Sequence, residues 1–247
     1  MTRKNSPSDN LVTMLRPDSV AAEAFRILRT NLSLRDFDKK LQVINVISAF
    51  QQEAKSTLVL NLGYVYSQLN KRVLILDLDL RLPSIHKKLK LRNKLGVTDI
   101  LSGKCELNDA LVHYTYNYDV LLSGSKTVYA SELIQSRAFK AFLELLKDRY
   151  DIILIDCPPI NMVTDGMITS TLTDGTIMCI ASNHDDKSDL LKAKDTIKQF
   201  DINMLGIVMT RMPAAKKYYS SEYGGYGYGY GYGSSHNSKK KRKFIKW

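Results

Sequence analysis

The chain has 247 residues, and 44% of them are hydrophobic, which is enough to bury one large core. Its formal net charge is +11 at pH 7, but residues 214–247 contain eight Lys or Arg and one Glu, so this tail carries +7 and the body only +4. Because the excess charge lies in the tail, it does not indicate a nucleic-acid-binding domain, and we expect no nucleic-acid partner.

The cysteines and the apolar runs indicate the compartment. Cys105, Cys157 and Cys179 have neither paired nor metal-type spacing, which fits a reducing cytoplasm. The sequence has no apolar run approaching the roughly 20 residues that span a bilayer. Residues 1–10 are polar and lack the apolar core of a signal peptide. We therefore expect a cytoplasmic protein.

The N-terminal part predicts an arm followed by a helix. Residues 1–17 are expected to form a flexible arm, and Asp18 or Ser19 then caps a helix over residues 18–34. The residues expected on the apolar face of this helix are Val20, Ala24, Ile27, Leu28 and Leu32. The polar residues of the same helix include Glu23, Arg26, Arg29 and Asn31. Their spacing alone is typical of a solvated face.

A βαβ unit follows, and the rest of the chain is organised around it. Its elements are an apolar strand, a turn, an amphipathic helix and a second apolar strand, over residues 43–47, 50–54, 55–68 and 73–76. Lys55, Ser56 and Thr57 open the helix. A helix N-terminus has free N–H groups and a partial positive charge, so this one predicts a phosphate site.

Beyond this unit, the pattern alternates strands with helices. After a basic connection over residues 83–93, short helical turns are expected at residues 97–101 and 108–112. Longer helices are expected over residues 131–149 and 187–200. The remaining strands are expected at residues 118–122, 151–155, 176–181 and 205–209. This alternation predicts an α/β fold, a mostly parallel sheet with right-handed crossovers and helices on both faces.

Carboxylates follow two of the predicted strands. Asp77 and Asp156 each end an apolar strand, so both are expected at the ligand-binding edge of the sheet. Asp79 lies two residues past Asp77 and faces the same side. A Walker-type nucleotide site needs such acids to hold Mg²⁺ beside a Lys and a Ser or Thr, and a further carboxylate to accept a proton from a hydroxyl. With Lys55 at the helix start, the pattern predicts a site for phosphates and Mg²⁺.

Several segments resemble the bacterial tyrosine kinase family, and together they cover most of residues 18–232. Residues 73–87 (VLILDLDLRLPSIHK) are similar to the family's second Walker motif, and residues 152–159 (IILIDCPP) to its Walker B motif. Residues 23–31 (EAFRILRTN) resemble its E-x-x-R-x-x-R-x-N oligomerisation motif. Further similar segments are residues 95–103, residues 131–134 and the tyrosine-rich end. The nearest subtype is the cytoplasmic kind associated with capsule or exopolysaccharide synthesis.

The resemblance implies a P-loop NTPase-like kinase site with ATP and Mg²⁺ as cofactors. Lys55 is implied to hold the β- and γ-phosphates, with Asp77 beside it. The implied Mg²⁺ ligands are Ser56, Asp77 and Asp156. Asp79 is implied to deprotonate a tyrosine. The implied nucleotide-contacting residues are Gln52, Glu53, Ala54, Lys55, Ser56, Thr57, Thr210 and Arg211.

The resemblance also implies how the chain assembles. A kinase domain over residues 18–212 is expected to form a homo-oligomeric ring in which each tail is phosphorylated by a neighbour. A separate transmembrane adaptor of the polysaccharide co-polymerase type is expected to activate it at the inner face of the cell membrane. The implied oligomerisation residues are Glu23, Arg26, Arg29 and Asn31.

The phosphate loop departs from the family pattern S-x-x-P-G-x-G-K-S-T. Gln52 and Ala54 stand where glycines are expected, Gln51 stands where proline is, and Thr210 replaces an Asn expected near the last strand's end. Glycine in such loops allows φ > 0 and lets backbone N–H groups close on phosphate. If Ala54 adopts a positive φ, the strain is of order 1–2 kcal/mol.

Three functional interpretations remain open at this point. The first is an ATP-dependent protein-tyrosine autokinase. The second is a nucleotide-weak scaffold, a pseudokinase subunit of the same polysaccharide assembly system. The third, a partitioning or cell-division ATPase, is less favoured because Phe50 occupies the position of a characteristic lysine in those proteins. Those ATPases also do not usually end in a tyrosine cluster.

Residues 213–247 are predicted to form a disordered tail with two parts. The phosphate acceptors expected in the first part are Tyr218, Tyr219, Tyr223, Tyr226, Tyr228, Tyr230 and Tyr232. The last nine residues, from Lys239 to Trp247, hold six cations and an apolar end, which favours binding to an anionic membrane surface. A nucleic-acid arm and a solvated tail are the alternatives for this second part.

Overall fold

The computed structural model describes residues 10–35, 41–182, 187–200 and 202–212, with side chains for all of these except residues 187–190. The described residues fall within one compact unit that ends at Met212. The predicted tyrosine acceptors and the basic end that begins at Lys239 lie outside the described residues.

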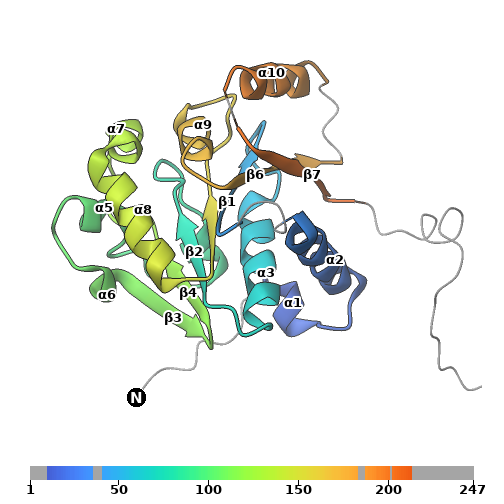
Figure 1. Ribbon diagram of the computed structural model, residues 1–247, viewed down its shortest axis with the longest axis horizontal. Helices are drawn as coiled ribbons and strands as arrows, with labels where there is room; N and C mark the ends of the chain where they lie inside the picture. The colour runs from blue at the N-terminus through green and yellow to red at the C-terminus, as the bar shows by residue number, and fades with distance from the viewer. Residues whose placement is uncertain (1–9, 36–40, 183–186, 201, 213–247) are drawn as a thin grey trace, which may run out of the picture. The chain divides into compact units, whose positions relative to one another are not determined.

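A seven-stranded sheet forms the centre of the molecule, in the order β3-β4-β2-β5-β1-β6-β7 (Figure 1). Its strands are β1 Val43–Ser48, β2 Val73–Asp77, β3 Leu111–Thr115, β4 Tyr118–Leu121, β5 Ile152–Asp156, β6 Gly175–Ala181 and β7 Met204–Thr210. Every neighbouring pair is parallel except β3 and β4, which are antiparallel. The predicted mostly parallel sheet is therefore confirmed.

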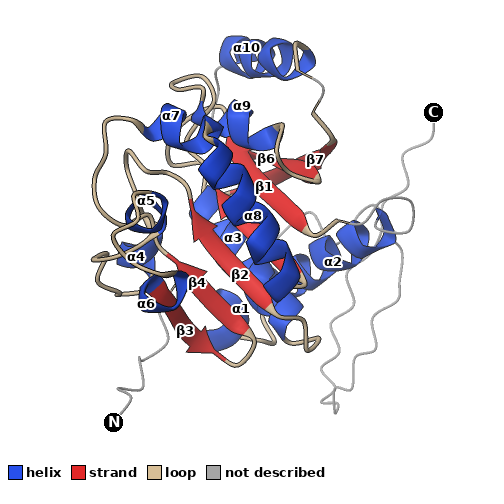
Figure 2. Cartoon of the chain, turned by 60° about the vertical axis from the view of Figure 1, so that its left-hand side comes forward, coloured by secondary structure: helices blue, strands red, loops and turns tan. Residues whose placement is uncertain are grey.

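Helices cover both faces of this sheet, as Figures 1 and 2 show. They are α1 Val12–Leu15, α2 Val20–Arg35, α3 Lys55–Ser67, α4 Ile85–Lys88, α5 Val97–Leu101, α6 Leu107–Ala110, α7 Ala130–Gln135, α8 Arg137–Arg149, α9 Asp165–Ser170 and α10 Lys187–Lys198. In the parts of the chain that the structure describes, no helix is both long enough and apolar enough to cross a bilayer.

Each face of the sheet has its own apolar core. Leu143 and Leu146 of α8 pack with Val43 of β1 on one face, whereas Leu62 of α3 packs with Ile44 of β1 on the other. Because both faces are covered, the central strands are apolar at nearly every position, which is the pattern that made them recognisable. The two cores support the sheet from both sides, up to the edge at which β1, β2 and β5 end.

The predicted flexible arm is wrong for its last residues. Leu11 and Thr13 are completely buried. The Thr13 N–H and hydroxyl both donate to Asn61 Oδ1 of α3, at 3.0 and 2.9 Å. A buried leucine and a satisfied pair of hydrogen bonds anchor α1, so this segment belongs to the folded domain. Residues 1–9 lie outside the described residues.

Two predicted helical segments also differ. The helical turn expected at residues 108–112 ends early, and Leu111 begins the antiparallel edge strand β3, whose hairpin with β4 turns at Asn117 with φ 56°. The helix expected over residues 131–149 is two helices. Ser136 is extended (ψ 152°) and its hydroxyl accepts from Phe139 N–H at 3.0 Å, which caps α8.

The apolar face predicted for α2 is partly wrong. Val20 is 68% exposed and Ile27 48% exposed, whereas Ala22 and Leu32 are buried. Periodicity identified a helix but not which of its apolar residues meet the domain, because α2 also leaves apolar side chains in solvent.

Candidate active site

The phosphate loop joins β1 to α3 and has left-handed backbone at two residues that are not glycine. Gln52 has φ 61°, and Ala54 has φ 64° with ψ 23°. A side chain in this region costs about 1–2 kcal/mol relative to glycine. The condition stated for Ala54, a positive φ, is thus met, and the loop keeps a shape that glycine favours although neither residue is glycine.

Glu53 and Thr210 brace this strained loop. The Glu53 side chain is buried, and its carboxylate accepts from Phe50 N–H at 2.9 Å and from Ala181 N–H at 3.3 Å. Thr210, the last residue of β7, donates its hydroxyl to the Glu53 carbonyl at 2.9 Å. Strained backbone persists where surrounding contacts over-determine it. These contacts tie the loop to the ends of β6 and β7.

The segment after β2 reaches across to the start of α3. Ser84 Oγ lies 2.6 Å from Ser56 Oγ. The Lys88 ammonium donates to the Thr57 hydroxyl at 3.1 Å. Both hydroxyls of the Lys-Ser-Thr sequence are therefore contacted by Lys88 of α4 or by Ser84, which precedes that helix, and Lys88 adds a second cation to the site.

The acids that end β2 and β5 form a buried pair. Asp77 and Asp156 are partners in the parallel register, and both side chains are buried. Burial, followed by the negative charges of Asp156 and Asp79, raises the pKa of Asp77 well above its usual range. Burial also raises the pKa of Asp156, while the nearby Lys55 ammonium and the Ser56 hydroxyl oppose that rise.

This donor set fits Mg²⁺. Asp156 Oδ1 is buried and has no hydrogen-bond partner among the described residues, so a lone pair remains for a cation. Asp77 and the Ser56 hydroxyl are the neighbouring oxygen donors. In the described ranges no cluster of three or more His, Cys, Asp or Glu forms a cage, but Mg²⁺ beside phosphates needs only one or two carboxylates.

Asp79 lies between the buried acids and the open site. Its side chain is half-buried, and Leu82 N–H donates to its Oδ1 at 2.9 Å. Burial raises the pKa of Asp79, opposed by that N–H and by the Lys55 charge. Lys55 itself is almost completely buried and donates to the Ser48 hydroxyl at 2.8 Å. Both side chains line the same cavity, and the Lys55 charge acts on Asp79.

A cavity of about 450 Å³ opens at this edge of the sheet. Its lining residues are Gln51, Gln52, Glu53, Ala54, Lys55, Ser56, Thr57, Asp79, Leu82, Ser84, Lys88, Pro159 and Arg211. It therefore collects every predicted nucleotide-contacting residue except Thr210. Asp77 and Asp156 lie beneath it rather than on its wall.

A second, mostly apolar cavity of about 560 Å³ shares part of this wall. Ala54, Thr57 and Arg211 line both cavities, and Thr210 lines the second. Its other walls come mainly from α2 and from the edge strand β7. The Thr210 hydroxyl is bonded to the loop carbonyl, so it braces the loop.

The implied oligomerisation residues lie on α2, away from the acids. Arg26 pairs with Glu23 at 2.8 Å and also donates to the Pro17 carbonyl at 2.6 Å. Arg29 donates to the Val65 carbonyl in the last turn of α3 at 2.8 Å, which satisfies one free carbonyl of that helix end. Asn31 is exposed. Both arginines thus have partners within their own chain.

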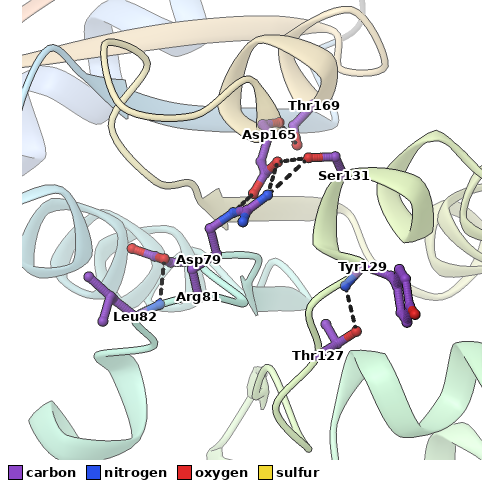
Figure 3. A network of polar contacts seen from close by, with 8 residues as sticks. All are labelled: Asp79, Arg81, Leu82, Thr127, Tyr129, Ser131, Asp165 and Thr169. Carbon is purple, nitrogen blue, oxygen red and sulfur yellow. Dashed lines mark hydrogen bonds and ion pairs between the residues drawn. The ribbon is translucent and has the colours of Figure 1, made fainter.

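Sequence reasoning missed a polar network next to Asp79, shown in Figure 3. Arg81 binds Asp165 and Ser131, residues 84 and 50 positions away along the chain. Sequence reasoning placed Ser84 in the second Walker motif and Lys88 in a basic connection, but assigned neither residue to the site. The alternation of Asp79 and Arg81 after β2 was the one local signal available.

These elements define a class of protein. The sheet is mostly parallel, and its strand β1 leads through a phosphate loop into a helix that begins Lys-Ser-Thr. With acids at the ends of two further strands, this is a P-loop NTPase-like domain.

Comparison with known proteins identifies the family. A family model described as an AAA domain matches residues 41–211. The chain is 33% identical to the tyrosine-protein kinase YwqD of Bacillus subtilis over 91% of this chain and 95% of that protein. It is also 33% identical to the tyrosine-protein kinase CpsD of Streptococcus pneumoniae over 81% of this chain and 88% of that protein.

A solved structure agrees with these relatives. The crystal structure of the chimerical protein CapA2B2 superposes with a TM-score of 0.80 and 32% identity, over 85% of this chain and 94% of that one. The chain therefore belongs to the bacterial tyrosine kinase family, as the sequence motifs predicted.

Proposed function

We propose that this chain is an ATP-dependent protein-tyrosine kinase that phosphorylates the tail tyrosines of a neighbouring copy. Its relatives are named tyrosine-protein kinases, and the proposal carries their activity to this chain. By the family resemblance, the reaction regulates capsular or exopolysaccharide synthesis.

The position of Asp79 is the observation that carries the proposal. Its half-buried carboxylate lines the same cavity as Lys55 and the phosphate loop. Burial raises its pKa, which strengthens it as a base at neutral pH. Asp79 is a third carboxylate, in addition to the buried pair of Asp77 and Asp156, and it reaches the cavity in which an incoming hydroxyl would lose its proton.

Each residue then has one role in the transfer. Lys55 and the N–H groups of the loop bind the β- and γ-phosphates. Ser56, Asp77 and Asp156 hold Mg²⁺, which when bound neutralises charge on the phosphates. Asp79 accepts the proton of the incoming tyrosine hydroxyl, and the phenolic oxygen attacks the γ-phosphoryl group in line. The bond between the γ-phosphorus and the oxygen that bridges it to the β-phosphate breaks, and ADP leaves.

Calorimetric titration with MgATP, alone and with the cytoplasmic segment of its adaptor, tests the binding step. Lys55→Met is expected to weaken MgATP binding about tenfold or more, because it removes the cation on the phosphates. Asp79→Asn is expected to leave the affinity within about threefold and to abolish transfer to tyrosine. Equal affinity of wild type and Lys55→Met would overturn the site assignment.

The proposed partners follow the same resemblance. A transmembrane adaptor of the polysaccharide co-polymerase type recruits the cytoplasmic kinase to the inner face of the membrane, and the subunits form a ring. The acceptors are the tail tyrosines from Tyr218 to Tyr232, and the cationic end from Lys239 to Trp247 binds anionic lipid.

One observation favours a second candidate, a nucleotide-weak scaffold of the same system. The side chains of Gln52 and Ala54 occupy loop positions with left-handed backbone, where glycine lets N–H groups approach phosphate closely. The scaffold would assemble with an active homologue that modifies its tyrosines. It predicts no heat of binding with MgATP under conditions in which the protein oligomerises normally.

A further inference from the structure

The chain after β2 continues as an alternating segment. Leu78 and Leu80 are buried in the core, whereas Asp79 is half-buried and Arg81 is exposed on the other side. Asp79 and Arg81 lie two residues apart, and the charge of Asp79 contributes to the raised pKa of Arg81. A constraint on the Arg81 side chain therefore constrains the backbone that presents Asp79.

Arg81 is held by a fork of hydrogen bonds (Figure 3). Its Nε donates to Asp165 Oδ2 at 2.8 Å, and its Nη2 donates to Asp165 Oδ1 at 3.3 Å and to Ser131 Oγ at 3.1 Å. The Ser131 hydroxyl donates in turn to Asp165 Oδ1. A planar guanidinium with two carboxylate bonds has a fixed orientation that a lysine cannot reproduce.

The other end of this fork is rigid. The Asp165 side chain is completely buried, and the Asp165 carbonyl accepts from the Thr169 hydroxyl at 2.9 Å within α9. Ser131 lies in α7, after β4, and Asp165 begins α9, after β5. Arg81 therefore ties the segment after β2 to those that follow both neighbouring strands in the sheet.

We propose that Arg81 is a positioning residue for the candidate base Asp79. Asp165 and Ser131 fix the guanidinium, the guanidinium fixes the backbone at residue 81, and that backbone together with the Leu82 N–H fixes the Asp79 carboxylate toward the cavity. This inference deepens the proposed function, because it rests on Asp79 acting as the base.

The same strand supplies a matched control at its opposite end. Arg72 immediately precedes β2 and makes a similar pair with Asp151, through Nη2 at 3.1 Å and Nε at 3.4 Å. Arg72→Ala removes an arginine–carboxylate fork from the same strand, far from the acids that end it. Arg81→Lys is the conservative variant, which keeps the charge and loses the fork.

The first measurement is transfer to tyrosine at saturating MgATP in the full-length protein. Arg81→Ala is expected to lower the rate about 10²-fold while the MgATP affinity stays within about threefold, because the base rather than the nucleotide is misplaced. Arg81→Lys is expected to recover part of the rate. Arg72→Ala is expected to leave both quantities unchanged. An unchanged rate in Arg81→Ala overturns the proposal.

The second measurement is amide hydrogen exchange, which needs no kinase activity. Arg81→Ala, and more mildly Ser131→Ala, are expected to speed exchange at residues 79–82 about tenfold without speeding it at β5. Faster exchange throughout the domain would show a role in stability alone and would overturn positioning. If the wild type binds MgATP but transfers no phosphate, the proposed kinase activity is refuted. The exchange rates at residues 79–82 still decide whether Arg81 holds this segment in place.

Discussion

Asp77 and Asp156 are register partners at the ends of two hydrogen-bonded parallel strands, and both carboxyl groups are buried. Two like charges in a dry site disfavour each other and lose hydration. The pair therefore retains protons that solvent-exposed acids would release, and it favours a divalent cation. This relationship connects the sheet topology to the chemistry of the site.

Replacing Asp156 with Asn is expected to stabilise the metal-free protein above neutral pH. The folded-state pKa of Asp156 is raised to about 6 from an ordinary 3.8, so the folded chain binds the proton more tightly than the unfolded chain. Stability is thus lost as the pH rises from about 4 through about 6, and Asn removes a loss on the order of 3 kcal/mol. Thermal denaturation with EDTA across this range measures the effect.

Asp151 is the matched control, because its shift has the opposite sign. The hydrogen bond from Arg72 lowers the pKa of Asp151, so its contribution to stability is present at neutral pH and is lost as the pH falls. Asp151→Asn is therefore expected to lower the melting temperature at neutral pH. A melting temperature of Asp156→Asn below that of wild type at every pH would contradict the account of the buried pair.

The double change Gln52→Gly with Ala54→Gly is expected to tighten MgATP binding. Both residues have positive φ, and glycine relieves strain of about 1 kcal/mol at each while it clears the approach to the loop N–H groups. Asn70→Gly is the control, since Asn70 has φ 58° at the far end of α3. If the double variant binds MgATP no better than wild type, strain in the loop does not limit affinity.

Removing the arginines of α2 is expected to shift the protein toward monomer and to lower phosphorylation between chains. The two arginines are expected to differ in their effect on stability. Arg29 also donates to the Val65 carbonyl at the end of α3 in the same chain, so Arg29→Ala is expected to lower the melting temperature as well. Arg26→Ala tests assembly more cleanly. Arg35→Ala, at the end of the same helix, is the control. Sedimentation velocity measures the distribution of oligomers. If Arg26→Ala leaves that distribution unchanged, these residues form a solvated surface and not an oligomer interface.

Truncation after Ser238 is expected to abolish binding to anionic vesicles. The removed residues carry six cations, each contributing roughly 1 kcal/mol near anionic lipid, together with Phe244 and Trp247 as apolar anchors. Binding of the unphosphorylated full chain is expected to fall with salt and with phosphorylation of the upstream tyrosines. Cosedimentation with anionic and neutral vesicles tests this, and equal binding to both would refute it.

The sequence predicted those parts of the fold that are determined by short stretches of the chain. The continuous apolar strands, the start of α3 at Lys55 and the acids Asp77 and Asp156 could be located because buried parallel strands and a phosphate-binding helix start have their own signatures. The sequence raised a positive φ at Ala54 only as a condition, because alanine stands where glycine was expected, and the structure shows that the condition is met.

The features that sequence reasoning missed depend on distant partners. The segment around Thr13 looked like an arm because its anchor, Asn61, lies 48 positions away. Arg81 was assigned only to a sequence motif, and its ion pair was missed, because Asp165 lies 84 positions away in a helix, α9, that was not expected. Tertiary contacts decide such positions, and periodicity in a single sequence does not record them.

The most direct test of the kinase assignment is transfer between two distinguishable copies. The donor carries Phe at all seven tail tyrosines, and the acceptor is the full chain with Lys55→Met, which keeps its tyrosines and loses its own activity. With MgATP and the activating segment, labelled phosphate is expected on the acceptor's tail, and Asp79→Asn in the donor is expected to remove it. An unlabelled acceptor, or equal labelling by the Asp79→Asn donor, would contradict the account.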